Sequence, residues 1–312
     1  MELDGPLAAW LARELGSAPE ETFFEAESMS RVAGVLLGDG RRVAVKIRGD
    51  HPRLAASAAA QRAAHAAGVD VPALLAGPEP VPGEPSRALA VTVEEWRDEG
   101  DLTPPVNAPE AFARLLAALV DALHGIPSAG LTPPPWLDYA HTDASRVWPP
   151  PASARWDPHR IEADLPKELA SYASRARARL AASSLELVLG HTDLNGLNVR
   201  WVGERPLVHD WDSIAALPEA VLVGTLALDH VAMPDAGAAA DVETGARVIA
   251  AFEAARGREF TSDEREIAWA TTVWLACYNA AFEHLHGAAG AVTARILADG
   301  HERLALAGVP GT

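Results

Sequence analysis

Polar side chains able to do chemistry gather in one stretch of the chain, between residues 188 and 218: His191, Asp193, Asn198, Asp210 and Asp212. Asp193 precedes two short apolar segments that are separated by a Gly203-containing turn, and Asp210 directly follows the second segment. This pattern predicts a β-hairpin, and a hairpin brings its two outer ends together. We therefore expect Asp193, Asn198 and Asp210 to face one small volume.

These residue types suit magnesium-dependent phosphoryl transfer. Carboxylate and amide oxygens are the hard ligands that Mg²⁺ takes, and a further carboxylate orients the attacking hydroxyl group. The order His-x-Asp-x-x-x-x-Asn at 191–198, followed by an Asp at the end of the next strand, is the order of the catalytic and metal loops of kinases. A polar turn between two core strands would use the same residues for turn geometry alone.

Lys46 strengthens the first interpretation. Residues 42–47, Arg-Val-Ala-Val-Lys-Ile, follow a Gly38-Asp39-Gly40 turn and have the alternation of a strand. A kinase carries its phosphate-binding lysine on such a strand, and Lys46 lies about 150 residues before the polar stretch. A metal-dependent hydrolase that uses the same carboxylates would leave this lysine unexplained.

On these motifs the chain resembles the aminoglycoside phosphotransferase and choline-kinase-like small-molecule kinases. Their H-G-D-x-x-x-x-N appears here as H-T-D-L-N-G-L-N, with Thr192 in place of Gly and Asn195 where the family often has His. Their I-D-[FW]-[ED] appears as V-H-D-W-D, and Asp229 is the nearest substitute for the family's D-L-A. By the order of its elements, the resemblance extends roughly from residue 20 to residue 290.

The resemblance implies an α+β, two-lobed, protein-kinase-like fold. The small N-lobe, residues 1–96, would hold a mainly antiparallel sheet that binds the nucleotide. The larger C-lobe, residues 97–312, would be mainly helical and carry the catalytic loop, the metal loop and the acceptor site. Apolar periodicity predicts its helices near residues 109–124, 159–183, 237–256 and 262–286.

The resemblance also implies roles for the central residues, with ATP and Mg²⁺ as cofactors. Asp193 would accept or orient the hydroxyl proton, and His191 would support the catalytic loop. Asn198 and Asp210 would hold Mg²⁺, and Lys46 would bind the ATP phosphates. Asp212 would serve as a secondary metal ligand, a structural acid or an acceptor contact.

Two further segments of the N-lobe are candidates for nucleotide binding. Ser28 and Ser30 lie where the resembled fold has its phosphate-covering loop, although the loop here lacks the glycine pattern of protein kinases and a solvated turn explains it equally. Backbone groups from Glu94 to Trp96 occupy the crossing between the lobes, where adenine would bind. An ordinary linker would need the same residues.

One departure from kinases bears on activity. Kinases pair the strand lysine with a helix glutamate, and here no acid lies between His51 and Gly68. A carboxylate from elsewhere, such as Glu25 or Glu27, is then required. Without it, the alternative is a catalytically weak nucleotide-binding or regulatory protein of the same fold.

The composition bounds the partners. With 26 basic and 43 acidic residues, the net charge is −17, which disfavours nucleic acid and anionic membranes as partners. A cationic small-molecule acceptor, such as an aminoglycoside or amino sugar, fits this charge, and Glu283 on a late helix is a candidate contact. The single cysteine, the acidic N-terminus and the lack of a long apolar run indicate a cytoplasmic location.

Overall fold

The structure is a computed structural model that describes residues 5–27, 30–84, 88–143, 145–151, 157–161, 164–233, 239–287 and 290–309. The chain forms two compact units. The first comprises Met1–Glu99 and Leu207–Asp212, and the second comprises Gly100–Pro206 and Ser213–Thr312. The predicted α+β class is confirmed, because an antiparallel sheet of five strands occurs with eight α-helices in the described part of the chain.

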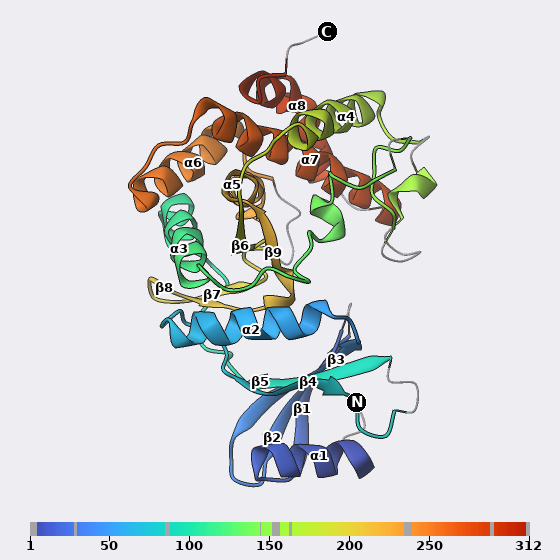
Figure 1. The fold of residues 1–312 in the computed structure, drawn as a ribbon, viewed down its shortest axis with the longest axis vertical. Helices are drawn as coiled ribbons and strands as arrows, with labels where there is room; N and C mark the ends of the chain where they lie inside the picture. The colour runs from blue at the N-terminus through green and yellow to red at the C-terminus, as the bar shows by residue number, and fades with distance from the viewer. Residues whose placement is uncertain are drawn as a thin grey trace. The chain divides into compact units, whose positions relative to one another are not determined.

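The first unit is built on the five-stranded sheet, in the order β1-β2-β3-β5-β4 with antiparallel neighbours (Figure 1). The strands are β1 (Pro19–Glu27), β2 (Arg31–Leu37), β3 (Arg42–Gly49), β4 (Leu74–Pro80) and β5 (Leu89–Glu95). Helices α1 (Gly5–Leu15) and α2 (Arg53–Ala66) lie on opposite sides of the sheet.

Strand β3 presents two different faces. Val43, Val45 and Ile47 are buried in a core that includes Leu11 and other apolar residues of α1. Successive side chains of a strand point to opposite faces, so Lys46 and Arg48 lie on the face away from this core. The alternation that the sequence shows thus places two cations side by side on one face of the sheet.

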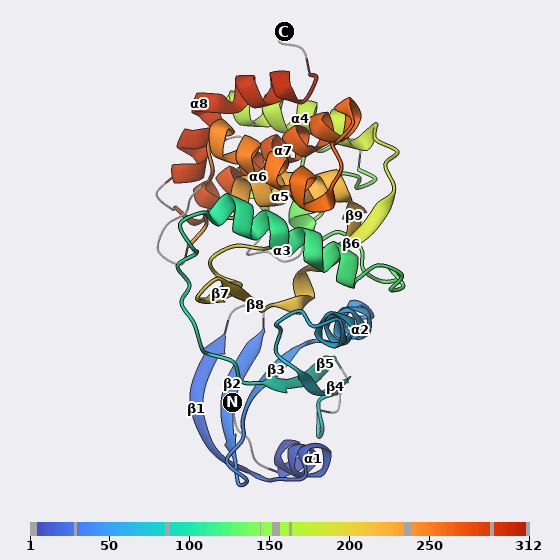
Figure 2. The ribbon, with the colours of Figure 1, turned by 90° about the vertical axis from the view of Figure 1, so that its left-hand side faces the viewer.

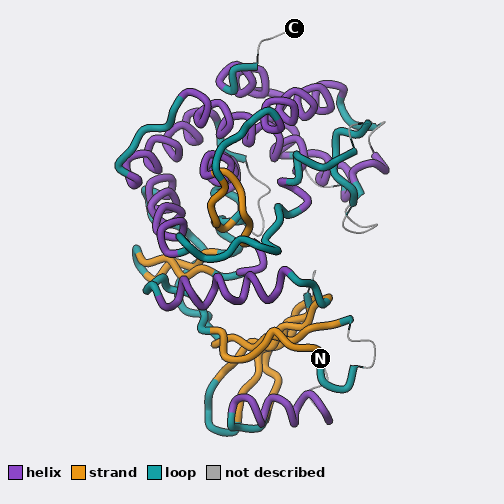
Figure 3. Tube along the Cα trace, viewed as in Figure 1, coloured by secondary structure: helices purple, strands orange, loops and turns teal. Residues whose placement is uncertain are grey.

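The second unit is mainly helical (Figure 3). Its helices are α3 (Ala108–Ala122), α4 (Lys167–Ala181), α5 (Glu219–Asp229), α6 (Val242–Arg256), α7 (Ser262–His286) and α8 (Ala291–Leu306). Helix α7 is buried along most of its length and packs against α4, α5 and α8 (Figure 2). Among the described residues, no helix combines the length and the apolar content that crossing a lipid bilayer requires.

Short strands lead the chain into and out of the polar stretch. Strand β6 (Leu187–His191) pairs with β9 (Ile214–Pro218), and β7 (Val199–Val202) pairs with β8 (Arg205–Val208). Short 3-10 helices are η1 (Pro135–Leu137), η3 (Pro158–Ile161) and η4 (Trp211–Ser213). The predicted hairpin is therefore β7–β8.

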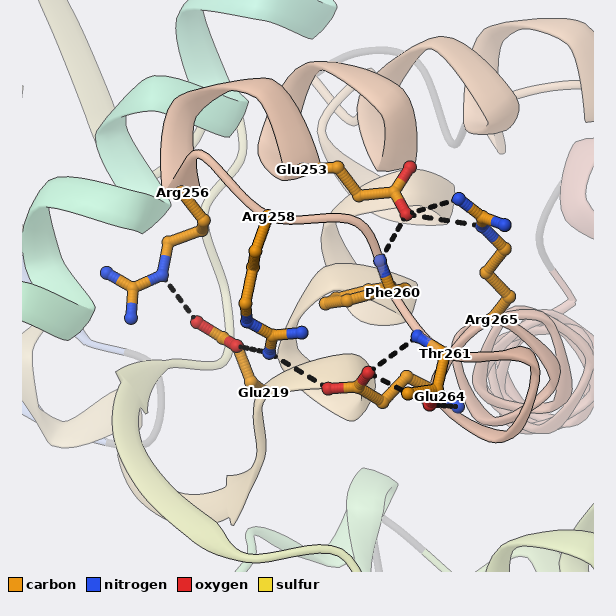
Figure 4. A network of polar contacts seen from close by, with 8 residues as sticks. All are labelled: Glu219, Glu253, Arg256, Arg258, Phe260, Thr261, Glu264 and Arg265. Carbon is orange, nitrogen blue, oxygen red and sulfur yellow. Dashed lines mark hydrogen bonds and ion pairs between the residues drawn. The ribbon is translucent and has the colours of Figure 1, made fainter.

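A polar network holds the turn between α6 and α7 (Figure 4). It joins three acids to three arginines: Glu219, Glu253, Glu264, Arg256, Arg258 and Arg265. Thr261 begins α7 with a capping box, since its Oγ1 accepts a hydrogen bond from the Glu264 backbone N–H (3.2 Å) and its own N–H donates to the Glu264 carboxylate (2.8 Å). Because Glu219 is the first residue of α5, the network ties α5 to both α6 and α7.

Helices α5 and α7 approach so closely that Gly224 leaves no room for a side chain. A Cβ at this position would lie 2.3 Å from the carbonyl oxygen of Ala268 in α7, and this oxygen belongs to the helix backbone and cannot rotate away. Gly224→Ala is expected to lower the free energy of unfolding by about 1–3 kcal/mol, measured by urea denaturation.

Gly245→Ala in α6 is the matched control for Gly224→Ala. Its Cβ would meet the nearest atom at 3.3 Å, and alanine is favoured over glycine inside a helix by up to about 1 kcal/mol. Because 3.3 Å is tighter than an ordinary contact, the two effects oppose each other, and the control is expected to stay within about 1 kcal/mol of the wild type. Equal stability of both variants would show that α7 moves aside without cost.

Candidate active site

The loop that follows β6 is anchored at its first residue. His191 ends the strand opposite Ile214 of β9, and the pairing continues because both the N–H and the Oγ1 of Thr192 donate to the carbonyl oxygen of Ser213 (2.9 and 2.7 Å). Thr192 is buried. A threonine in place of the family's glycine therefore has a structural role here: its hydroxyl adds a second hydrogen bond to Ser213, the residue just before β9.

Asp193 is held by three neighbouring side chains. Its backbone N–H donates to Nδ1 of the buried His191 (3.2 Å). Its Oδ1 accepts a hydrogen bond from Asn195 Nδ2 and its Oδ2 accepts one from Asn198 Nδ2, both at 2.7 Å. The two amide donors fix the orientation of the carboxylate in the way that a positioned base requires.

Asn198 offers its other side-chain atom to a ligand. Its NH₂ group is used by the carboxylate and the backbone carbonyl of Asp193 (2.7 and 2.9 Å), which leaves Oδ1, a hard oxygen donor, for a metal. The structure thus brings together Asp193 and Asn198, two of the three side chains that were expected to face one volume. Asp210, the third, belongs to the first unit.

Asp210 has an uncommon backbone conformation. Its φ of 57° lies in the left-handed region, which costs most residues about 1–2 kcal/mol but is tolerated best by Gly, Asn and Asp. In the described residues no three His, Cys, Asp or Glu side chains form a ready metal cluster. Mg²⁺ needs no such cluster, because one or two carboxylates, substrate phosphates and water commonly complete its shell. Asn198 and Asp210 each carry a hard oxygen donor of this kind.

The acid beside Lys46 comes from a strand. Lys46 Nζ lies 2.8 Å from Glu94 Oε2, and both side chains are largely buried. Lys46 faces Thr92 across the β3–β5 ladder, and Glu94, two residues further along β5, lies on the same face. Glu94 therefore supplies the carboxylate that α2 lacks.

Trp96 follows β5 and is used in packing. Its backbone N–H donates to the carbonyl of Arg42 (3.1 Å). An adenine ring would therefore have to contact another backbone group between Glu94 and Trp96. Its ring packs edge to face on Phe23 (centroids 4.9 Å apart) and lies over Gly34, where a Cβ would approach it to 2.8 Å. Ser30 is half-buried just before β2, and Ser28 lies outside the described residues.

Asp212 and Glu283 are both engaged by the protein. The Asp212 carboxylate forms an ion pair with Arg48 Nη1. The Glu283 carboxylate accepts hydrogen bonds from the backbone N–H groups of Val292 and Thr293, both at 2.9 Å, and is buried at the start of α8. Glu283 thus caps a helix, and its role as a contact of the phosphoryl acceptor stays a prediction.

Asp229 lies beside the loop at residues 192–198. The sequence indicated Asp229 only as a substitute in a weak motif. Asn195 Nδ2 bridges it to Asp193, at 3.2 Å from Asp229 Oδ2 and 2.7 Å from Asp193 Oδ1. Asn195 Oδ1 accepts from the Leu197 N–H (2.9 Å), which sets the direction of the amide. Burial raises the pKa of Asp229 to about 6, opposed by the hydrogen bond from Asn195.

The raised pKa of Asp229 makes stability depend on pH. A carboxyl group whose pKa is raised by folding stabilises the fold while it is protonated, so the contribution of Asp229 to stability is expected to be lost as the pH rises from about 4 through 6. The loss is roughly 3 kcal/mol at most. The asparagine of Asp229→Asn cannot ionise. The unfolding free energy of this variant, measured by urea denaturation, should therefore rise relative to that of the wild type as the pH increases over this range.

Glu186→Gln, at an exposed position, is the control for Asp229→Asn and should follow the wild type at every pH. A constant difference between Asp229→Asn and the wild type from pH 4.5 to pH 8 would contradict the assignment.

Comparison with known proteins identifies similar sequences and folds. A profile of the "phosphotransferase enzyme family" matches residues 30–269, whereas no curated protein sequence matches the chain. A solved choline/ethanolamine kinase family protein from Mesorhizobium loti has 17% identity and a TM-score of 0.55, covering 94% of this chain and 88% of that one.

Two further solved structures contain ligands. An amicoumacin kinase in complex with AMP-PNP, Ca²⁺ and Ami has 13% identity and a TM-score of 0.63, covering 96% of this chain and 93% of that one. Aminoglycoside phosphotransferase APH(4)-Ia, in a ternary complex with ADP and hygromycin B, has 16% identity and a TM-score of 0.55, covering 98% and 99%. At these identities the likeness establishes the fold, and the predicted kinase-like fold is confirmed.

Proposed function

Since the chain belongs to the phosphotransferase enzyme family, as its motifs predicted, we propose that it transfers a phosphoryl group from ATP, with Mg²⁺, to a hydroxyl group of a small molecule. The observation that carries the proposal is the geometry of Asp193. Its two carboxylate oxygens are held by Asn195 and Asn198, the second of which is also the proposed metal ligand. A single loop thereby combines a base and a metal donor.

Each remaining residue has a role in this proposal. Asp193 accepts or orients the proton of the acceptor hydroxyl, and buried His191 supports the loop through the Asp193 N–H. Asn198 and Asp210 would hold Mg²⁺, which when bound neutralises phosphate charge. Lys46, positioned by Glu94, would bind the ATP phosphates.

The Lys46–Glu94 pair also bears on the competing hypothesis, a catalytically weak nucleotide-binding or regulatory protein. Its main argument was the lack of a helix glutamate, and Glu94 supplies an equivalent carboxylate from β5. Backbone groups near Glu94 and Trp96 remain the proposed adenine contacts. The loop with Ser28 and Ser30 remains the proposed phosphate cover.

For the acceptor we propose an amine-bearing alcohol, such as an aminoglycoside or amino sugar. The net charge of −17 favours cations, and two proteins of similar fold were solved with hygromycin B and with Ami. The chain is then expected to use an amino sugar better than its neutral hydroxyl counterpart, with an advantage that shrinks as salt rises. Equal use of the neutral sugar would contradict the cationic class.

The test of the proposed function is direct. The purified chain, ATP and Mg²⁺ are incubated with a panel of amino sugars and aminoglycosides, and mass spectrometry detects acceptors that gain a phosphoryl group. Asp193→Asn serves as the control for contaminating kinases. Tight Mg²⁺–ATP binding with no transfer to any alcohol would favour the regulatory alternative.

A further inference from the structure

Asp229, the last residue of α5, is an acid that the proposed function does not use. Its Oδ2 accepts a hydrogen bond from Asn195 Nδ2 (3.2 Å), and the same nitrogen donates to Asp193 Oδ1 (2.7 Å). An amide nitrogen carries two N–H groups, so each carboxylate can take one of them. The Asn195 oxygen accepts from the backbone N–H of Leu197 (2.9 Å). A flipped amide would turn that oxygen toward two carboxylates, so these neighbours select one orientation of the buried Asn195 side chain.

Helix α5 has contacts at both ends and in its middle that fix the place of Asp229. Its first residue, Glu219, is held by the arginines of the polar network (Figure 4). In the middle, Gly224 lies directly against the backbone of α7. At the C-terminal end the buried His230 ring packs on Phe112 of α3, with the ring centroids 5.8 Å apart. A shift of Asp229 relative to the loop at residues 192–198 would therefore disturb the packing of α5 on α3 and α7.

The turn after α5 also supports the backbone of this loop. The N–H of Gly196 donates to the carbonyl oxygen of Ala232 (3.0 Å), and the N–H of Ala232 donates to the carbonyl oxygen of Asp229 (2.9 Å). A Cβ at Gly196 would lie 2.8 Å from the same Ala232 oxygen, so the two backbones are in close contact. Since these bonds do not use the Asp229 side chain, that side chain has a narrower task, which is to direct Asn195.

We propose that Asp229 is a positioning residue that orients Asp193 through Asn195. The inference rests on the proposed function, in which Asp193 is the base. The two N–H groups of Asn195 lie in one amide plane, so the bond to Asp229 sets the direction of the N–H that holds Asp193. A base accelerates proton transfer only within hydrogen-bond reach and in the correct direction, so a loosened Asn195 is expected to slow turnover.

Steady-state kinetics of the full-length chain test the proposal at pH 8, above the pKa of Asp229 of about 6. Asp229→Ala is expected to lower turnover roughly 3–10-fold and to leave the KM for ATP within about two-fold of the wild type. Asp229→Asn keeps a side-chain oxygen that can accept from Asn195, so its turnover is expected to stay within about two-fold. Equal losses in the alanine and asparagine variants would overturn the inference, because the hydrogen bond would then not be the property that matters.

A double-mutant cycle shows whether Asp229 acts through Asn195. If it does, Asn195→Ala combined with Asp229→Ala should have a turnover within about two-fold of Asn195→Ala alone. Losses that multiply would overturn the inference. Thr225→Val is the control, one turn earlier in α5, where the hydroxyl donates to the carbonyl oxygen of Val221 in the same helix (2.9 Å). Its turnover should stay within about two-fold of the wild type. A loss as large as that of Asp229→Ala would show that any change in α5 has this effect and would also overturn the inference.

A second measurement separates this inference from the proposed function. Urea denaturation of the four proteins of the cycle, with neither metal nor nucleotide, reports whether Asp229 and Asn195 are coupled. Non-additive unfolding free energies support the hydrogen bond, and additive values would overturn the inference. A wild type that phosphorylates no alcohol would contradict the proposed function while leaving this coupling measurable. A wild type that transfers phosphate no faster than Asp229→Ala would overturn the inference while leaving the proposed function in place.

Discussion

Asp193→Asn is expected to lower the turnover of phosphoryl transfer by a factor of roughly 10² or more, with nucleotide affinity nearly intact. The substitution removes the proposed base. It also disturbs the loop, because both Asp193 oxygens accept from amide groups, and an asparagine NH₂ cannot accept. One donor is left facing another, which adds a stability cost of about 1–3 kcal/mol.

Asn195→Ala is the matched variant for Asp193→Asn. It removes the hydrogen bond from Asn195 to the carboxylate and keeps the base, so a loss of turnover of roughly ten-fold or less is expected. Steady-state kinetics, together with calorimetry of nucleotide binding, distinguishes the two variants. Near wild-type turnover of pure Asp193→Asn would refute the catalytic assignment.

Asp210→Ala is expected to abolish magnesium-dependent nucleotide binding, whereas Asp212→Ala should cost much less. Asp210 lies two residues after the end of β8, where the resemblance places the metal carboxylate, and Asp212 is already paired with Arg48. Calorimetry with a non-hydrolysable ATP analogue, with and without Mg²⁺, measures the difference. If Asp212→Ala loses more of the magnesium-dependent nucleotide affinity than Asp210→Ala does, then Asp212 is the metal ligand in place of Asp210.

The left-handed backbone of Asp210 requires a second variant, because alanine is disfavoured at a φ of 57°. Asp210→Asn removes the charge and tolerates this conformation. Both variants are expected to lose the effect of Mg²⁺. If only Asp210→Ala loses the effect of Mg²⁺ and Asp210→Asn keeps it, the defect comes from the strained backbone and not from the loss of a metal ligand.

Local patterns predicted much of the fold. The apolar periodicity of residues 262–286 corresponds to α7 (Ser262–His286), and that of residues 109–124 to α3 (Ala108–Ala122). The expected helix at 159–183 is instead η3 and α4, because Pro166 precedes the helix that begins at Lys167. Periodicity alone did not show this break.

The contacts within the loop at residues 192–198 could also be predicted from the sequence, because Asp193, Asn195 and Asn198 lie within six residues of one another. The acid that pairs with Lys46 could not be predicted in this way. Glu94 reaches Lys46 only because β5 pairs with β3, and sheet order and register are set by packing over long separations.

The role of Glu283 also could not be predicted from the local sequence. Its position on α7 suggested a surface acid, but its role depends on α8, which the sequence did not indicate. Once α8 begins at Ala291, the backbone N–H groups of Val292 and Thr293 need acceptors, and Glu283 provides them.

The discontinuity of the first unit has a consequence for how the chain folds as it leaves the ribosome. Residues 1–99 are synthesised first, but the segment Leu207–Asp212 follows only after the 107 residues from 100 to 206. At about 5–20 residues per second, the nascent sheet waits roughly 5–20 s for it. During that interval Arg48 and Arg53 have no Asp212, and the carbonyl oxygen of Asp70 lacks the N–H of Val208 (3.0 Å). The unit built on the five-stranded sheet is thus completed from within the sequence of the helical unit, so the two cannot be separated by a single cut in the gene.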